Sequence, residues 1–330
     1  MTRMTFQQAA VAAIADEMAA DEGVFVMGQD VGRFGGPLRS NAGLFETFGA
    51  ARVIDMPMSE GTMAGLAVGA ALQGKRPVLD LMFGEFLALV MQQFLDAGAM
   101  HYYSGGAATV PFVLRVKYGI GPFHGHAYDH HSWLMGVPGV KIAAPSTPQD
   151  AYDLMRAAIR DPNPVLFLEH MALYHAGRAE VERRAPPRPL GPAATLREGA
   201  DVTLIGSALM AKRALRAAEA LAKEGIEAEV IDLRTIAPWD EETVLASVRR
   251  TGRALLLSEA VAHGASINDV AARIAEAAFD ALRAPVRRLA PPPVPTPFAR
   301  ELEAAYLPDE ARIAGAARDL VRARAPAPAR

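Results

Sequence analysis

The chain has 330 residues and a net charge of −3, and 51% of its residues are hydrophobic whereas 22% are charged. This length and composition predict two globular domains and give no electrostatic reason to expect nucleic acid as a partner. Because cysteine is absent, disulfides, thiolate metal sites and cysteine nucleophiles are excluded. The apolar runs are too short to span a bilayer, and residues 1–23 are typical of an amphipathic helix rather than a signal peptide, so we expect no membrane contact and a cytoplasmic location.

Short apolar strands and helices alternate in the first half of the chain. The predicted strands are Val24–Gly28, Arg52–Asp55, Pro77–Met82, Pro111–Val116, Val140–Ala144 and Val165–Leu168, and the predicted helices are Glu60–Leu72, Glu85–Tyr102 and Pro148–Arg160. This alternation favours a parallel sheet that is covered by helices on both faces. Because ligands of such sheets bind beyond the carboxyl ends of the strands, we expect a functional rim formed by loops 29–41, 56–60, 83–86 and 117–132.

A charged and proline-rich stretch, Ala176–Pro192, has no apolar period and is typical of a linker. After it the alternation restarts. The predicted strands are Val202–Gly206, Ala228–Leu233, Ala254–Ser258 and Val286–Leu289, and the predicted helices are Leu209–Lys223, Glu241–Arg249 and Ser266–Leu282, with Asp240 as an N-cap. The sequence therefore predicts an α/β protein with two domains, residues 1–176 and 200–330, joined by a linker at 177–199.

A single acid, Glu60, stands at the start of the almost uncharged stretch EGTMAGLAVGAALQG. With Ser59 as the predicted N-cap, Glu60 falls in the first turn, where the helix dipole alone stabilises a carboxylate by roughly 0.3–1 kcal/mol. The rest of the helix suggests a functional role for this acid. It has no polar face, and Gly61, Gly65 and Gly69 form a ridge without side chains that can approach another backbone. A helix that is apolar all round is buried, and burial would raise the pKa of Glu60 so that it could share a proton with a ligand nitrogen.

Several stretches together resemble one protein family. They are VFVMGQDVGRFGG, RVIDMPMSEGTMAGLAVGAALQGKRPV, YYSGG, VPGVKIAAPSTPQDA, AAIRDPNPVLFLEHMALY and EVIDLRTIAPWDEETVLASVRRTG. They are similar to the beta subunit of the thiamine diphosphate-dependent first component of the pyruvate, branched-chain 2-oxo acid and acetoin dehydrogenase complexes. The resemblance implies a parallel-sheet, pyrimidine-binding domain followed by a transketolase C-terminal-like α/β domain.

The same resemblance implies roles for particular residues. In the family, the glutamate at the position of Glu60 hydrogen-bonds N1′ of the cofactor's aminopyrimidine, and the shared proton activates the cofactor for attack on the keto carbon of the substrate. We therefore expect Glu60 to be catalytic and to bind cofactor. The family also stacks an aromatic ring on the pyrimidine, at the position of Phe86, and we expect Met82 to bind cofactor beside it. From the residues alone, Phe86 could equally be an ordinary core side chain.

The usual thiamine diphosphate signature, Gly-Asp-Gly followed downstream by Asn, is absent, as are the common phosphate-binding loops. The absence implies that this chain carries only the pyrimidine half of the site and no metal ligands. By resemblance, an alpha subunit supplies the half that holds the diphosphate and Mg²⁺, in a heterotetramer of two alpha and two beta chains. We expect the isolated chain to bind cofactor weakly and to have no decarboxylase activity. Whether a monovalent cation also binds, as in several relatives, the sequence leaves open.

Four of the eight histidines lie in the stretch KYGIGPFHGHAYDHHS, residues 117–132. Imidazoles together with Asp129 could bind zinc or a similar ion, although their spacing matches no defined metal motif. The stretch could also be a surface loop without chemistry. The third interpretation is acid–base or anion-stabilising work, because histidine titrates closest to neutral pH.

The family places a catalytic histidine twelve residues before the proline of a Pro-Gly pair, and counting back from Pro138 gives His126. We therefore predict His126 as the second catalytic residue. Its neighbours differ from the family's Gln-His-Ser-Gln, so His124, His130 and His131 remain alternatives.

The leading functional prediction is the beta subunit of a 2-oxo acid dehydrogenase complex. It would decarboxylate a 2-oxo acid oxidatively, or cleave acetoin, and transfer the acyl group to the lipoyl-lysine of the core acyltransferase. One alternative is half of a split transketolase, whose sugar phosphate substrates need basic residues at the rim. That rim offers only Arg33, Arg39, Arg115 and Lys117. The other alternative is an inactive regulatory or scaffold subunit, since the histidine loop departs from the family.

The resemblance extends to the second domain, for which it implies subunit contacts and docking onto the acyltransferase core. Glu259 and His263 lie in its stretch SEAVAHGASIND, and we assign them no catalytic role.

Overall fold

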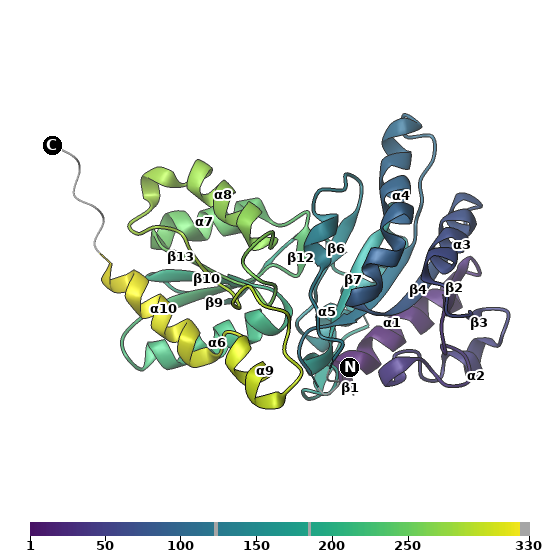
Figure 1. Ribbon diagram of the computed structural model, residues 1–330, viewed down its shortest axis with the longest axis horizontal. Helices are drawn as coiled ribbons and strands as arrows, with labels where there is room; N and C mark the ends of the chain where they lie inside the picture. Colours follow the sequence, from purple (N-terminus) through teal and green to yellow (C-terminus); the bar gives the residue numbers. More distant parts are fainter. Residues whose placement is uncertain (122–124, 184–185, 324–330) are drawn as a thin grey trace. The chain divides into compact units, whose positions relative to one another are not determined.

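The computed structural model describes residues 1–121, 125–183 and 186–323, and the chain divides into two compact units, 1–190 and 191–330 (Figure 1). The stretch predicted as a linker is not free of secondary structure. It contains β8 (Ala179–Val181), which pairs with β1 (Thr2–Met4), and β9 (Ala194–Arg197), an edge strand of the second unit. Within the described ranges, every helix falls short of the length and hydrophobicity that a bilayer span requires.

The first unit is built on a parallel sheet with the strand order β6-β7-β5-β4-β2-β3. In chain order these strands are β2 (Val24–Gly28), β3 (Val53–Asp55), β4 (Arg76–Phe83), β5 (Val113–Tyr118), β6 (Lys141–Ala143) and β7 (Val165–His170). Helices cover both faces. Helix α1 (Phe6–Ala20) packs against α5 (Pro148–Arg160) on one face, and α3 (Glu60–Leu72) stands beside α4 (Met91–Tyr103) on the other (Figure 1). A short helix, α2 (Leu44–Phe48), precedes β3.

Prediction and structure differ most after β4. The sequence predicted one helix from Glu85 to Tyr102, but residues Gly84–Val90 form 3₁₀ turns, η2, and the α-helix begins only at Met91. Val90, with φ −122° and ψ 7°, separates the two segments. A Cβ on Gly84 would lie 2.9 Å from the carbonyl oxygen of Tyr128, so the start of η2 is fixed by the loop packed against it. Phe86 is therefore placed by tertiary packing rather than by a regular helix.

The second unit has the strand order β14-β13-β10-β11-β9, in which β9 is the antiparallel strand. The strands after β9 are β10 (Val202–Gly206), β11 (Ala228–Asp232), β13 (Ala254–Leu257) and β14 (Arg287–Leu289), and β12 (Thr235–Ala237) follows β11 along the chain. One core cluster joins β10 to α6 (Ala208–Ala222) and α10 (Glu310–Arg322). A second joins the sheet to α7 (Glu241–Thr251) and α8 (Ile267–Ala277), and α9 (Arg300–Tyr306) precedes α10. Asp240 caps α7 as predicted, because its carboxylate accepts a hydrogen bond from the backbone N–H of Thr243.

Candidate active site

A small apolar cluster lies where β4, β5 and β7 reach their carboxyl ends. Its members are Phe83, Ala127 and Met171, which are buried, and Leu38, Met82, Phe86 and Ile120, which are partly exposed. Most of these residues come from loops 29–41, 83–86 and 117–132, whereas Met82 lies at the end of β4 and Met171 directly follows β7. Three of the four loops of the predicted rim therefore meet in space.

The backbone at Met82 is strained. Its φ is +74°, a left-handed value that costs a residue other than glycine about 1–3 kcal/mol unless its surroundings impose it. The strain coincides with an irregularity in the pairing of β4 with β5, between Asp80 and Phe83. Asp80 supports this conformation, because its Oδ1 accepts a hydrogen bond of 3.0 Å from the backbone N–H of Met82.

His126 lies beside Phe86. Its ring stacks on Phe83 with centroids 4.5 Å apart and planes at 14°, and it lies 6.0 Å from the ring of Phe86 at 59°. The side chain of His126 is 40% exposed, and its Nδ1 is 3.8 Å from Oε2 of Glu85. The other oxygen of Glu85 accepts from the backbone N–H of Tyr128 at 3.3 Å. The histidine predicted from the Pro-Gly spacing is thus stacked on Phe83 and lies near Phe86, the aromatic ring predicted to bind cofactor.

Glu60 is the first residue of α3 and is partly exposed. The first turn of α3 packs against η2, where a Cβ on Gly61 would lie 3.4 Å from the carbonyl oxygen of Leu89. Because η2 also carries Phe86, Glu60 and Phe86 belong to two segments in direct contact. Ser59 is the N-cap residue, but its hydroxyl donates to Oγ1 of Thr62 instead of capping the backbone.

The apolar sequence of helix α3 predicted burial on all sides, but the helix is buried on one side only. Met63, Ala64 and Ala67 face the core, whereas Gly65 and Leu66 are exposed, Leu66 at 52%. The sequence pattern could not distinguish burial within this chain from burial against another one. The exposed side of α3 is an apolar surface that a partner could cover.

The remaining histidines of the loop have different surroundings. His131 is buried, and its Nδ1 is hydrogen-bonded to the carboxylate of Asp129. Burial raises the pKa of Asp129, but the charge and hydrogen bonds of His131 lower it more, so that the carboxyl stays ionised. His130 stacks on Trp133 with centroids 4.2 Å apart, and burial lowers its pKa.

His124 lies outside the described residues. In the part of the loop that the structure describes, no three carboxylate or imidazole groups gather in a way that could hold a metal ion.

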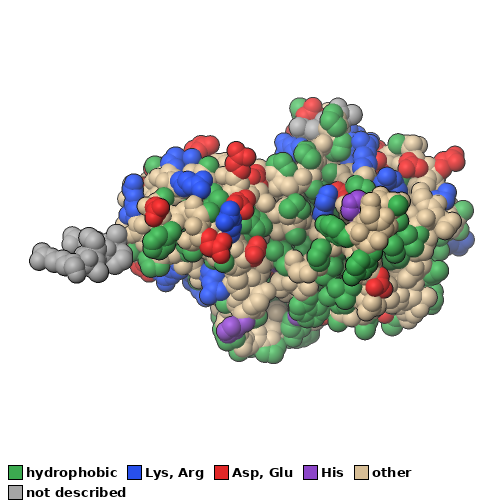
Figure 2. All heavy atoms as spheres, turned by 90° about the horizontal axis from the view of Figure 1, so that it is seen from above, with side chains coloured by type: hydrophobic (Ala, Val, Ile, Leu, Met, Phe, Trp, Pro, Cys, Tyr) green, Lys and Arg blue, Asp and Glu red, His purple; other side chains and the backbone are tan. Residues whose placement is uncertain are grey.

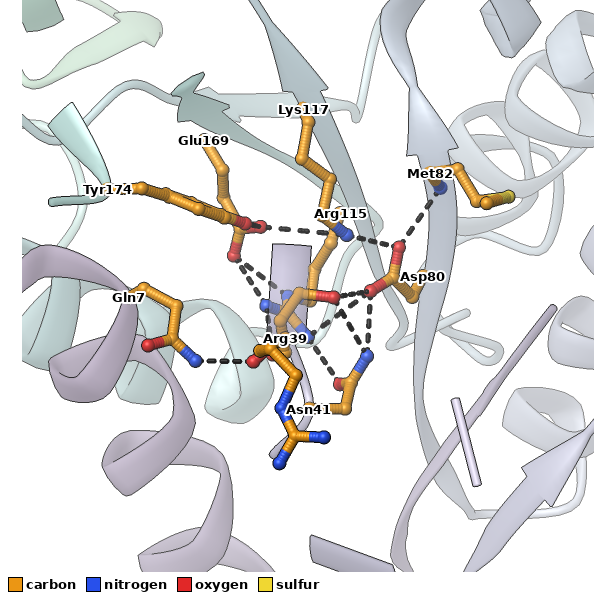
Figure 3. A network of polar contacts seen from close by, with 10 residues as sticks. Gln7, Arg39, Asn41, Asp80, Met82, Arg115, Lys117, Glu169 and Tyr174 are labelled. Carbon is orange, nitrogen blue, oxygen red and sulfur yellow. Dashed lines mark hydrogen bonds and ion pairs between the residues drawn. The ribbon is translucent and has the colours of Figure 1, made fainter. Parts of the chain in front are cut away.

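Arg115 and Lys117 do not belong to the rim, which corrects the prediction that they are available there. Both side chains are at most 1% exposed and lie within a network of buried charges (Figure 3). Arg115 donates from Nε and Nη2 to Oε1 of Glu169, at 2.9 and 2.7 Å, and Lys117 donates to Oδ1 of Asp80. Burial raises the pKa of Asp80, but the charges of Lys117 and Arg115 hold it well below its usual range. The network therefore contains two cations and two carboxylates that neutralise one another.

Sequence reasoning missed Asp80, Glu169 and Tyr174 as members of this network. The signal was present: Asp80, Arg115 and Glu169 are charged residues within largely apolar strands, in PVLDLMF, VLRVKY and VLFLEH. A charge within a strand that is buried on both faces needs a partner of opposite charge. The acids of β4 and β7 could have been paired with the arginine of β5, the strand between them.

Comparison with known proteins shows the family. Residues 2–176 match the transketolase pyrimidine-binding domain, and residues 191–313 match the transketolase C-terminal domain. The chain is 40% identical to the 2-oxoisovalerate dehydrogenase subunit beta and 41% identical to the pyruvate dehydrogenase E1 component subunit beta, both of Bacillus subtilis, over 97% of this chain and 99% of each relative. It belongs to the family of dehydrogenase beta subunits.

This beta-subunit family also includes the acetoin:2,6-dichlorophenolindophenol oxidoreductase subunit beta of Cupriavidus necator, which is 41% identical over 93% of this chain and 94% of that relative. Among solved structures, a split-gene transketolase described as an inactive beta4 tetramer matches with a TM-score of 0.77, at 20% identity, over 97% of this chain and 99% of the other. That match confirms the two-domain α/β fold. It carries no argument about the substrate.

Proposed function

We propose that this beta subunit forms half of the thiamine diphosphate site in the first component of a 2-oxo acid dehydrogenase complex, or of its acetoin-cleaving equivalent. The observation that carries the proposal is the placement of Glu60, Met82, Phe86 and His126. They come from contacting segments at the carboxyl end of the parallel sheet, in a family of dehydrogenase beta subunits. Ligands of parallel sheets bind at this end.

The residues fit the pyrimidine ring of the cofactor. Phe86 and Met82 offer a partly exposed apolar surface that includes the aromatic ring of Phe86. Glu60 adds one carboxylate from the first turn of α3, which packs against η2. Thiamine diphosphate, when bound, supplies the electron sink that allows the bond next to the keto carbon of the substrate to be cleaved. Phe86 and Met82 would hold the pyrimidine ring through apolar contacts, and Glu60 would hold a proton at its carboxylate for the ring nitrogen.

We assign proton transfer during the acyl step to His126. Its side chain is 40% exposed, so a substrate or a lipoyl group can reach it, and its ring centroid lies 6.0 Å from that of Phe86, the ring proposed to bind the pyrimidine. His131 is less suited to the role, because it is buried and bonded to Asp129.

An alpha subunit completes the site in this proposal. It supplies the diphosphate-binding half and most of the Mg²⁺ ligands, in a heterotetramer of two alpha and two beta chains that docks onto a lipoyl-bearing acyltransferase. Apolar side chains on α3, η2 and α4 are available to contact it: Leu66 is 52% exposed, Leu89 54% and Tyr103 89%. Figure 2 shows hydrophobic side chains gathered on the surface of the first unit. Exposed apolar area of this kind marks an interaction surface.

The structure weakens the split-transketolase alternative. Sugar phosphates need cations at the mouth of the site, and two of the four bases predicted there, Arg115 and Lys117, are buried and neutralised by Asp80 and Glu169. Of the four bases predicted at the rim, Arg33 and Arg39 remain available to a substrate.

Co-expression with the cognate alpha subunit tests the proposal. The purified complex is assayed with pyruvate, branched-chain 2-oxo acids, acetoin and ketose phosphates, with an artificial electron acceptor and with added thiamine diphosphate and Mg²⁺. We expect turnover of at least one 2-oxo acid or of acetoin, and none by the isolated beta chain. Turnover of ketose phosphates alone would support the split transketolase. A well-assembled complex without any cofactor-dependent turnover would support the scaffold subunit.

A further inference from the structure

We propose that Asp80 is a positioning residue whose single carboxylate fixes two separate walls of the pyrimidine pocket, the bulge at Met82 and the turn that carries Leu38. The inference rests on the proposed function, because it takes the corner around Phe86 as the pocket. Asp80 is fully buried, lies on β4 and is not itself a member of the apolar cluster.

The first wall is held by Oδ1. This oxygen accepts the backbone N–H of Met82 at 3.0 Å, two residues further along the strand. Because Met82 has φ +74°, its conformation persists only where surrounding contacts impose it. The bond from Asp80 is such a contact, and it sets the direction in which Met82 leaves the strand.

The second wall is held by Oδ2. Ser40 donates its hydroxyl to this oxygen at 2.7 Å, and Asn41 donates its amide at 2.8 Å. The two preceding residues, Leu38 and Arg39, both have left-handed backbones, with φ of +54° and +61°. Leu38 packs against the same cluster as Met82 and Phe86. Asp80 therefore anchors the end of the strained turn that points Leu38 at the pocket.

The charge of Asp80 is essential to this double role. Besides the three donors from the two walls, Oδ1 accepts from Lys117, and Nη1 of Arg115 lies 3.8 Å from Oδ2 (Figure 3). An ionised carboxylate only accepts, so it can serve all of these donors. An asparagine in its place would turn an NH₂ group toward either Met82 and Lys117 or Ser40 and Asn41. Turned toward Met82, the NH₂ group meets the backbone N–H as donor against donor; turned toward Ser40 and Asn41, it can be accepted by the hydroxyl of Ser40 but meets the amide donor of Asn41. Either way, one wall loses a hydrogen bond.

The test compares Asp80→Asn with Tyr174→Phe in the complex with the alpha subunit. Tyr174 donates to Glu169 in the same buried network but touches neither wall, so Tyr174→Phe is the control for a general weakening of the network. Two quantities are measured: the thiamine diphosphate concentration for half-maximal activity, and the rate of amide hydrogen exchange in peptides that cover residues 36–41 and 80–84.

For Asp80→Asn we expect the half-saturating cofactor concentration to rise at least about ten-fold, with faster exchange in one or both peptides. For Tyr174→Phe we expect less than about a two-fold change in half-saturation, even if the unfolding temperature falls. Ser40→Ala is the second test variant, to be used if Asp80→Asn does not fold. It keeps every charge, and we expect faster exchange in residues 36–41 only and a smaller rise in half-saturation.

Unchanged exchange and half-saturation in Asp80→Asn, or in Ser40→Ala where only that variant folds, would overturn the inference. An equal effect of Tyr174→Phe would overturn it as well. The exchange measurement also works on the beta chain alone. If the wild-type complex bound no cofactor, the proposed function would fail, while exchange would still show whether Asp80 holds the two segments.

Discussion

His126 and His131 stand five positions apart in one loop and have opposite surroundings. The side chain of His126 is 40% exposed and stacks on Phe83, whereas His131 is buried against Asp129. In the proposed function, removal of the first imidazole takes away the proton donor of the acyl step. Removal of the second leaves the carboxylate of Asp129 buried without its partner, a change that typically costs about 3–5 kcal/mol.

We therefore predict that His126→Ala lowers acyl transfer to a lipoyl group by about 10²–10⁴-fold and leaves the unfolding temperature nearly unchanged. His131→Ala should instead lower the unfolding temperature markedly. Transfer assays with a lipoyl domain, together with thermal unfolding of both variants, check the assignment. A stably folded His131→Ala that blocks transfer, beside an active His126→Ala, would move the catalytic role to His131.

The roles of Glu60, Met82, Phe86 and His126 stay predictions, which the resemblance to the family supplied because each residue lies in or can be counted from a recognisable motif. Asp80 was not predicted, because its hydrogen bonds join three segments that are distant in sequence. The backbone of Met82, the loop at Ser40 and the cation of Lys117 meet only after the sheet has formed.

At the scale of elements, α3 combines a correctly predicted extent with a wrongly predicted burial. Its glycines explain how the extent could be predicted correctly and the burial wrongly. A Cβ on Gly65 or Gly69 would meet no atom within 4 Å, so these two glycines of the ridge have no packing role inside the chain. Glycine also lowers helix stability by about 1 kcal/mol relative to alanine. A ridge that weakens its own helix is consistent with close contact to another subunit.

We predict that Gly65→Ala/Gly69→Ala stabilises the isolated chain, by up to about 2 kcal/mol, and weakens its association with the alpha subunit. Gly315→Ala is the matched control, since Gly315 lies within α10 and its Cβ would also have open space. That variant should gain stability without a change in association. Denaturant unfolding and titration of the alpha subunit measure the two effects. Unchanged association in the α3 double variant would argue against this ridge as a contact.

The start of α5 could be predicted because local chemistry sets it: the side chain of Thr147 accepts a hydrogen bond from the backbone N–H of Asp150, and Pro148 occupies the first turn. The 3₁₀ turns of η2 could not be predicted, because the contact that shapes them comes from Tyr128, far along the chain. Strands β1, β8 and β9 are only three or four residues long and show no alternation that a pattern could detect.

At the scale of the whole molecule, the chain matches a pyrimidine-binding domain but lacks the Gly-Asp-Gly motif of a diphosphate site. Glu60 is partly exposed, and the apolar sides of α3 and α4 beside it are uncovered. Both observations are explained if a second polypeptide closes the site. Its arrival would exclude water from Glu60 and create the dry surroundings in which a carboxyl can share a proton near neutral pH.

The most direct test of this account is the rate at which the C2 proton of bound thiamine diphosphate exchanges with deuterium in the complex of both subunits. Glu60→Gln keeps the size of the side chain but cannot take up and release a proton. We predict that exchange in the Glu60→Gln complex slows by about 10²–10⁴-fold, while the complex still assembles and binds cofactor. Exchange as fast as in the wild-type complex would contradict the role of Glu60 and the account built on it.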